Sequence, residues 1–258
     1  MTHTILITGA ARRLGRNLAL FLAKERYNIA LTYNKSREDA LSLQQEIMAL
    51  NVKCKIYQLD FEDADKTDKL IELVYADFSD LKVLINNASI FAEQSFLQAS
   101  RQDLMNNFNV HLFSPLMLSQ SFANIVGTGK IINITDLRVK TETPRFFPYL
   151  LSKKSLSNLT LMLAKELEPA IEVNEIRPGI LLKNDQYDPA EDLSNELTKR
   201  QNIESFYAAV KDLLDNKYYG RQVELGDEAD KILANFVDER SGDTKNSEYI
   251  SHKDIWGD

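Results

Sequence analysis

The sequence has 258 residues, of which 44% are hydrophobic, and carries a formal net charge of −7. This length suits one α/β domain with a sizeable core. The negative charge excludes nucleic acid as a partner, because phosphates demand a basic face. The single cysteine, Cys54, permits no intrachain disulfide and is expected to be a small buried thiol.

The three histidines, His3, His111 and His252, are scattered without metal-ligand spacing, so they are expected to be structural or solvent-exposed, and no metal site is predicted. No apolar run reaches the length of a membrane span. The apolar segment 4–8 runs directly into Gly9 and is too short for the core of a secretory signal. We therefore expect a soluble, cytoplasmic protein without membrane contact, in a compartment where thiols stay reduced.

Strand and helix patterns alternate from the start of the chain. Short apolar runs rich in β-branched residues predict buried parallel strands, and apolar residues at helical spacing predict the helices between them. After Gly179 the pattern loosens, and only one more strand is expected. The predicted strands are residues 4–8, 29–33, 53–59, 81–86, 130–135, 171–176 and 221–224, and the predicted helices are residues 14–25, 38–50, 65–77, two within 101–124, and 149–168.

This alternation predicts a doubly wound parallel sheet of about seven strands, a three-layer α/β/α Rossmann fold with helices on both faces. Such folds bind ligands in a crevice at the carboxyl ends of the strands. We expect one Rossmann-type domain over residues 1–228, with a mobile segment at 180–200. The charged and weakly apolar residues 229–258 are expected to form a C-terminal appendage.

The first predicted strand ends in a glycine turn, Thr8-Gly9-Ala10-Ala11-Arg12-Arg13-Leu14-Gly15, which leads into the first helix. A turn of this kind directs backbone N–H groups and a helix N-terminus at a phosphate. Two adjacent arginines suit a pyrophosphate, although an ordinary loop with exposed arginines is the alternative. The candidate cofactor contacts are Gly9, Arg12, Arg13 and Leu14.

The second predicted strand ends without an acidic residue. Sites that prefer NAD place an acid there for the ribose 2′-hydroxyl, whereas this chain has no acid until Glu38. The donors and cations that precede Glu38 suit a 2′-phosphate instead, so the sequence predicts NADPH as the cofactor. These residues are Asn34, Lys35, Ser36 and Arg37, of which the first three are the candidate contacts.

Tyr149 and Lys153 stand four residues apart at the start of the last long predicted helix, on one face of it. A nearby ammonium is expected to lower the pKa of the phenol from about 10 toward neutrality. A tyrosine tuned in this way can give a proton to a substrate atom that receives hydride. Asp136 stands at the carboxyl end of the preceding predicted strand, which places it at the same crevice.

The same Tyr-x-x-x-Lys spacing recurs at Tyr207/Lys211 and at Tyr249/Lys253. Spacing alone cannot separate the three pairs, so position in the fold decides between them. Only Tyr149 opens a helix that follows a predicted core strand, where its side chain can face the crevice. We interpret the other two pairs as solvated helix faces.

In their order along the chain, these motifs resemble the short-chain dehydrogenase/reductase family over residues 3–227. The set comprises Thr-Gly-x-x-x-x-x-Gly, Asn86-Asn87-Ala88, Tyr149/Lys153 and Arg177-Pro178-Gly179. The resemblance implies that Asp60 contacts the adenine ring, that Asn109 helps to hold a proton-relay water and that Lys153 binds the nicotinamide ribose. The further cofactor contacts implied are Asn87, Ala88, Tyr149, Pro178 and Gly179.

Three departures from the family's usual pattern resemble the pteridine reductases, including the bacterial dihydromonapterin reductases. Arg13 replaces the middle glycine, Asp136 replaces the serine thirteen residues before the tyrosine, and Ser89-Ile90-Phe91 follows the Asn-Asn-Ala segment. The resemblance implies that the arginine reaches both pyrophosphate and pterin, the phenylalanine stacks on the pterin and the aspartate assists protonation. The implied substrate contacts are Arg13, Ser89, Phe91, Asp136 and Tyr149, and the implied catalytic residues are Asp136, Tyr149 and Lys153.

Each of these three residues has a simpler interpretation. Phe91 can be a core aromatic, Asp136 can cap a turn or helix, and Arg13 can serve the phosphates alone. That all three coincide favours the pteridine reductase interpretation. The segment from Leu181-Leu182-Lys183-Asn184-Asp185 through Leu197-Thr198-Lys199 also resembles the corresponding loop of the dihydromonapterin reductases.

These residues predict the NADPH-dependent reduction of a dihydropterin, such as dihydromonapterin, dihydrobiopterin or dihydrofolate, to its tetrahydro form. Two alternatives stay open. The first is a carbonyl reductase of another small substrate, which Asp136 disfavours because a carboxylate is a poor neighbour for a developing alkoxide. The second is a non-catalytic NADP-binding sensor, which would be expected to have lost Tyr149 or Lys153. By resemblance, the long helices pair across a two-fold axis in a homotetramer.

Overall fold

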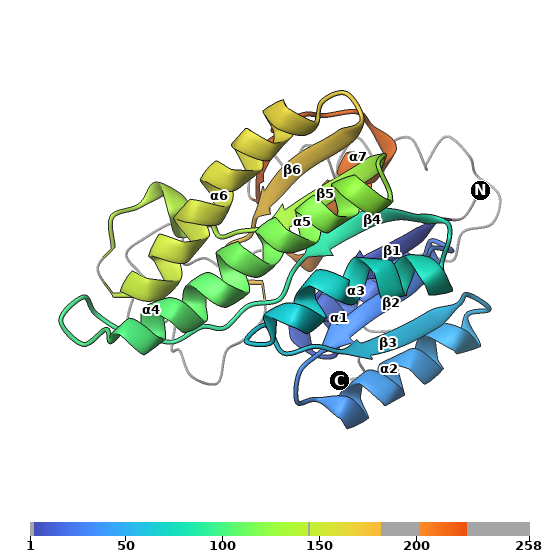
Figure 1. The fold of residues 1–258 in the computed structure, drawn as a ribbon, viewed down its shortest axis with the longest axis horizontal. Coiled ribbons are helices and arrows are strands. Elements are labelled where there is room, and N and C mark those ends of the chain that lie inside the picture. The colour runs from blue at the N-terminus through green and yellow to red at the C-terminus, as the bar shows by residue number, and fades with distance from the viewer. Residues whose placement is uncertain (1–2, 144, 182–201, 226–258) are drawn as a thin grey trace.

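The computed structural model describes residues 3–143, 145–181 and 202–225. Within them, seven parallel strands form one sheet in the order β3-β2-β1-β4-β5-β6-β7 (Figure 1). The predicted doubly wound fold is confirmed. Most of the predicted segment 180–200 and all of the predicted appendage 229–258 lie outside the described residues. The strands are β1 (Thr4–Ile7), β2 (Asn28–Tyr33), β3 (Cys54–Gln58), β4 (Leu81–Asn86), β5 (Gly129–Ile134), β6 (Ile171–Arg177) and β7 (Gln222–Glu224).

Helices cover both faces of the sheet and enclose two apolar cores (Figure 1). One core lies under α1, α2 and α7, with Leu18 and Val210 among its buried residues. The other lies under α3, α5 and α6 and includes Leu118 and Phe122. In the part of the chain that the structure describes, no helix combines the length and apolarity that crossing a membrane requires. The bounds are α1 (Arg13–Lys24), α2 (Arg37–Ala49), α3 (Ala64–Asp77), α4 (Arg101–Phe108), α5 (Ser114–Ile125), α6 (Phe147–Leu167) and α7 (Ile203–Asp215).

No bounds are predicted for helix α7 from the sequence, although a helix face is expected at the pair Tyr207/Lys211. Asn202 caps it by accepting from the Glu204 N–H at 3.0 Å, and Phe206, Val210 and Leu213 are buried on one side, at the spacing of an amphipathic helix. The interpretation of the pair Tyr207/Lys211 as a solvated face is therefore wrong for the tyrosine. Its ring stacks on Phe21 with 4.5 Å between centroids. The pair Tyr249/Lys253 lies outside the described residues.

The two helices predicted within 101–124 form a run with a wider turn in the middle. Ser100 and Asp103 form a capping box that starts α4, and α5 begins at Ser114 with Pro115 in its first turn. Between them, η1 (Asn109–Phe113) is a five-residue π-helix. Such turns insert an extra residue into a helix and are frequent at functional sites. Here the turn directs the side chain of His111 into the interior.

The carboxyl ends of β1 and β4 meet at the centre of the sheet, where the strand order reverses direction. The Thr8 hydroxyl accepts from the backbone N–H of Asn87 and of Ala88, both at 3.0 Å. The Asn87 side chain donates to the Thr8 carbonyl at 2.8 Å. Gly9 has a positive φ of +62°, and a Cβ built there would lie 2.8 Å from the Ala88 Cα. The turn can therefore approach β4 only because it lacks a side chain at this position.

We predict that Gly9→Ala lowers the free energy of unfolding more than Gly127→Ala does. Both glycines have a positive φ, +62° and +71°, so both substitutions carry the left-handed strain of about 1–2 kcal/mol. A Cβ at Gly127 would meet only the Ala123 carbonyl, at 3.8 Å. Gly9→Ala adds a backbone clash worth about 1–3 kcal/mol. Urea unfolding measures both variants, and equal losses would contradict the close approach.

Candidate functional site

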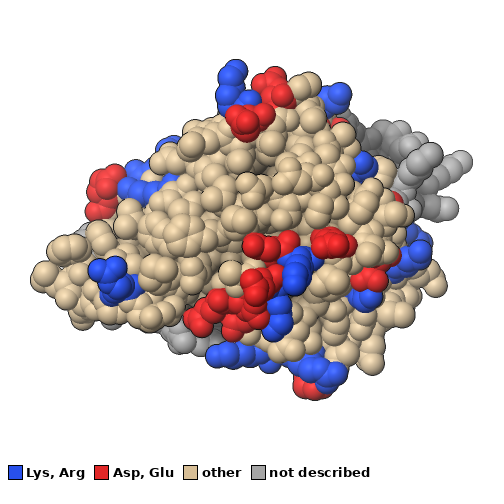
Figure 2. Space-filling model, viewed as in Figure 1, with Lys and Arg blue, Asp and Glu red and all other residues tan. Residues whose placement is uncertain are grey.

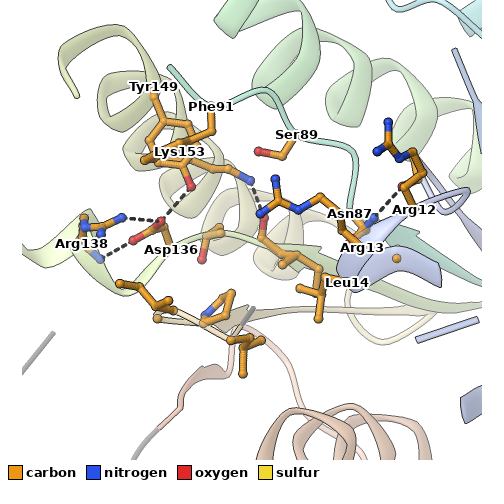
Figure 3. A pocket seen from close by; sticks show the side chains of 18 residues that line it. Arg12, Arg13, Leu14, Asn87, Ser89, Phe91, Asp136, Arg138, Tyr149 and Lys153 are labelled. Atoms are coloured by element: carbon orange, nitrogen blue, oxygen red, sulfur yellow. Dashed lines mark hydrogen bonds and ion pairs between the residues drawn. The ribbon is translucent and has the colours of Figure 1, made fainter. Parts of the chain in front are cut away.

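A cavity of about 400 Å³ opens at the carboxyl ends of the central strands (Figure 3). It joins the glycine turn, the segment after β4, the end of β5 and the start of α6. Most of the site residues predicted from the sequence line it. These residues are Gly9, Arg12, Arg13, Leu14, Asn87, Ser89, Phe91, Asp136, Tyr149, Lys153, Pro178 and Gly179.

Five predicted cofactor contacts do not line this cavity. Asn34 and Lys35 are exposed beyond the end of β2, and Ser36 precedes α2. Asp60 follows β3, where its carboxylate accepts from the Glu62 N–H at 3.1 Å, and Ala88 packs behind Gly9. All five stand at the carboxyl edge of the sheet, next to the cavity, so their predicted contacts remain predictions.

The glycine turn presents a helix N-terminus to the cavity. Helix α1 has no side-chain cap, because its N-cap residue is Arg12. The turn is fixed to β2, since the Gly9 N–H donates to the Thr32 hydroxyl at 2.9 Å. It also packs closely against Asn87, since a Cβ at Gly15 would lie 2.6 Å from the Asn87 Nδ2. Arg13 has a positive φ of 53°. Uncapped N–H groups at a helix start, beside arginines, favour a bound anion.

Asp136 and Tyr149 form a buried hydrogen-bonded pair at the other end of the cavity (Figure 3). The phenol donates to the carboxylate, with 2.7 Å between Tyr149 Oη and Asp136 Oδ2. Both residues are buried, with 6% of Tyr149 and 8% of Asp136 exposed. The other carboxylate oxygen, Oδ1, accepts from the Arg138 N–H at 2.7 Å and caps η2 (Leu137–Lys140). Asp136 is thus a cap and a partner of the tyrosine at once.

The electrostatics of this pair differ from the expectation that Lys153 lowers the pKa of Tyr149. Burial and the adjacent Asp136 raise the pKa of Tyr149 well above its ordinary value. Burial also lowers the pKa of Lys153, to about 8, and its ammonium donates to the Ile134 carbonyl at 2.7 Å. The prediction was wrong because sequence spacing does not reveal desolvation, which is the largest cause of the shift. Tyr149 is therefore a neutral phenol that holds its proton.

Phe91 combines features of a core aromatic and of a ligand-facing ring, the two roles considered for it from the sequence. Its ring meets Tyr149 edge-on and tilts against Phe146, with 4.9 Å between centroids in each pair. It belongs to a small apolar cluster with these two residues, yet it also lines the cavity. One part of the ring is therefore a packing surface and another part is available to a ligand.

Two residues of the site were not identified from the sequence. Arg138 lines the cavity, lies 3.7 Å from the Asp136 carboxylate and places its guanidinium over Phe146 at 5.1 Å. His111 is 1% exposed and contacts Ser89 and Ser152. The signal for Arg138 was its position two residues after Asp136. Helical spacing does indicate that His111 is buried, because it stands four residues after the buried Asn107 and three before the buried Ser114. The spacing does not reveal its contacts with the segment after β4.

Asn109, expected to help hold a relay water, does not line the cavity and is half-buried two residues before His111. No group of three or more histidine, cysteine, aspartate or glutamate side chains in the described ranges could hold a metal ion.

The family model described as "short chain dehydrogenase" matches residues 3–192. The 3-oxoacyl-[acyl-carrier-protein] reductase FabG of Staphylococcus aureus (strain Mu50 / ATCC 700699) is 33% identical over 210 residues, which cover 78% of this chain and 81% of that protein. The diacetyl reductase [(S)-acetoin forming] of Staphylococcus epidermidis is 28% identical over 100% of this chain and 98% of its own.

Among solved structures, FolM alternative dihydrofolate reductase 1 from Brucella suis, crystallised with NADP, superimposes with a TM-score of 0.79. It is 27% identical, and the match covers 90% of this chain and 95% of that one. Acetoin dehydrogenase from Enterobacter cloacae gives a TM-score of 0.76 at 25% identity, over 87% and 94% of the two chains. Because the family model spans most of the described sheet and the cavity-lining motifs, the chain belongs to the short chain dehydrogenase family.

Proposed function

We propose that this protein is an NADPH-dependent reductase of a dihydropterin, which it converts to the tetrahydro form. The observation that carries the proposal is the buried pair of Asp136 and Tyr149, 2.7 Å apart, beside the ring of Phe91. A phenol that keeps its proton next to a carboxylate is suited to protonate a ring nitrogen. The family membership supports an oxidoreductase, and the finer substrate assignment rests on this pair.

The residues of the cavity fit a dinucleotide. The turn at Gly9 has no room for a side chain against Ala88, and the uncapped start of α1 with Arg12 and Arg13 suits a pyrophosphate. Lys153 and Asn87 line the same cavity, and by resemblance Lys153 would bind the nicotinamide ribose and Asn87 would lie beside the cofactor. The cofactor supplies the hydride when bound. The NADP in the FolM structure supports the same cofactor for this chain.

The chain itself supplies the proton and the orientation. Tyr149 donates its proton to the reacting substrate atom, and Asp136 holds the hydroxyl in line until then. Lys153, fixed by the Ile134 carbonyl, keeps a positive charge near the phenol as the proton leaves. Phe91 and Ser89 line the substrate side of the cavity, and Arg13 stands where it can reach both ligands.

A carbonyl reductase is the second candidate, and the FabG and diacetyl reductase relatives favour it. Solved structures of both kinds match the chain at similar identity, FolM at 27% and the acetoin dehydrogenase at 25%. The carboxylate of Asp136 disfavours the carbonyl substrate, because an alkoxide would develop beside a negative charge. A sensor without catalysis is disfavoured because Tyr149, Lys153 and Asp136 all stand in the cavity.

The surface formed by α4, α5 and α6 supports the proposal of a homo-oligomer, by resemblance a tetramer. Figure 2 shows that charged side chains are few over α5 and α6, whereas they crowd over α3. The exposed large apolar side chains of these helices and of η1 are Met105, Phe113, Ile125, Leu151, Leu161 and Met162. Apolar faces of this kind mark protein interfaces.

The predicted location in the cytoplasm remains a prediction.

For the cofactor, we expect Lys35→Ala to weaken NADPH binding much more than NADH binding. Loss of one charge-assisted phosphate contact costs about 1.5–3 kcal/mol, roughly ten- to a hundredfold in affinity. Fluorescence titration with both nucleotides measures it. Lys53→Ala is the matched control, because Lys53 is exposed before β3, at the opposite edge of the sheet. Equal affinity of the unmutated protein for both nucleotides would refute the proposed preference.

For the chemistry, we expect Tyr149→Phe and Asp136→Asn each to reduce dihydropterin turnover by at least about 10²-fold. The double variant should be little worse than either alone, because both residues belong to one proton-delivery unit. Tyr149→Phe should leave NADPH affinity nearly unchanged. NADPH oxidation is followed with dihydrobiopterin, dihydromonapterin, dihydrofolate and diacetyl as substrates.

Tyr207→Phe is the control for these variants, since it keeps the ring that stacks on Phe21 and should leave turnover intact. Asp136→Ser restores the residue usual in the wider family. If this variant kept full dihydropterin turnover, or if the unmutated protein reduced diacetyl alone, the carbonyl reductase would be the better assignment.

For the assembly, we expect Met162→Glu to reduce the oligomer observed by light scattering at micromolar concentration. Met162 is 69% exposed on α6, and a charge there would be buried without a partner in a paired face. Met48→Glu is the matched control, because Met48 is 55% exposed on α2, away from this surface. A monomeric unmutated protein would disprove the predicted assembly.

A further inference from the structure

His111 connects two segments of the site that are distant in the sequence. It projects from the π-helix η1 into the interior and is 1% exposed. Its Nδ1 lies 2.8 Å from the Ser152 hydroxyl on α6. Its Nε2 lies 3.0 Å from the Ser89 hydroxyl and accepts from the Ile90 N–H at 3.2 Å. Both ring nitrogens are therefore engaged, each by a different wall of the site.

The direction of these hydrogen bonds fixes the form of the ring. A backbone N–H can only donate, so the Nε2 that faces Ile90 must carry a lone pair. The proton of a neutral imidazole then stands on Nδ1 and is donated to Ser152. The Ser152 hydroxyl in turn donates to the Tyr149 carbonyl at 2.7 Å. The bonds therefore run in one direction, from the segment after β4 to the first turn of α6.

The surroundings keep the imidazole neutral. Burial, and then the charge of Lys153, lower the pKa of His111 well below its ordinary value. The ring also stands edge-on to Tyr149, with 5.4 Å between centroids. At neutral pH the Nε2 acceptor is therefore retained, and neither bond depends on a change of protonation.

The segment that His111 holds carries Phe91, whose ring packs against Tyr149 at 4.9 Å (Figure 3). We propose that His111 is a positioning residue that fixes the Ser89–Phe91 wall against α6 and so sets the substrate side of the cavity. It touches no reacting atom. The inference rests on the proposed function in one respect, the placement of Ser89 and Phe91 on the substrate side.

Two substitutions of similar size separate the two bonds of the ring. His111→Gln places an oxygen acceptor near the position of Nε2 and loses the Nδ1 donor. His111→Asn places an N–H donor near the position of Nδ1 and loses the Nε2 acceptor. His111→Leu removes both bonds while it keeps an apolar side chain in the buried space.

The first measurement is hydrogen–deuterium exchange of the Ile90 amide in the full chain with NADPH, which needs no substrate. Loss of its acceptor should accelerate exchange about tenfold in His111→Asn and His111→Leu. His111→Gln should restore most of the protection. If all three variants exchange at the rate of the unmutated protein, the positioning role is overturned, whatever reaction the enzyme catalyses.

The second measurement is kinetic and uses whichever of dihydrobiopterin and diacetyl the unmutated enzyme reduces faster. His111→Asn should raise the KM for that substrate about tenfold, with the NADPH Kd and kcat changed much less, and His111→Gln should rescue the KM. Equal KM values in Asn and Gln variants of equal stability, or a loss confined to NADPH binding, would overturn the proposal. Should His111→Leu fail to fold, the Asn and Gln pair decides.

Discussion

The hydroxyl of Thr8 accepts two backbone N–H groups from the start of the segment after β4, and the Asn87 side chain donates back to the carbonyl of Thr8. These bonds hold the carboxyl ends of β1 and β4 together at the point where the strand order reverses. The glycine turn leaves one strand there, and the Ser89–Phe91 wall leaves the other. The two ends of the cavity, one suited to phosphates and one to a flat ring, are therefore fixed by a single junction.

Burial sets the chemistry at the second end of the cavity. The phenol of Tyr149 and the ammonium of Lys153 are both removed from water, which raises the pKa of Tyr149 and lowers that of Lys153 to about 8. At neutral pH the phenol is therefore neutral and the lysine still carries its charge. Asp136 keeps its place by bonds to the phenol and to the Arg138 backbone. The phenol of Tyr149, the carboxylate of Asp136 and the amino group of Lys153 are thus buried close together at one end of the cavity. Burial thus reverses the ordinary order of the two pKa values, since Tyr149 holds its proton more tightly than Lys153 does.

The sequence allowed the sheet, the glycine turn and the Tyr149/Lys153 site to be predicted, because strand runs and turn glycines are local signals. The bounds of helix α7 are not predicted, although Phe206 and Val210 keep helical spacing, because an irregular stretch separates this helix from the regular alternation of strands and helices before it. The pKa direction of Tyr149 was wrong, since it depends on burial by distant segments. The role of His111 could not be predicted, because its bonds to Ser89 and Ile90 depend on how the segment after β4 packs against η1, which no local pattern reveals.

The π-turn at Asn109–Phe113 has a geometric consequence for α4 and α5. An α-helix advances about 100° per residue, and the wider turn holds one residue more than an α-helical turn does. It therefore acts as a phase shift between the two helices, which rotates the face of α5 relative to that of α4. The loss of one residue from this turn would restore α-helical phase and change which residues of α5 face the core when α4 stays in place. Chain length in this turn, and not only residue identity, thus determines which side chains of α5 are buried.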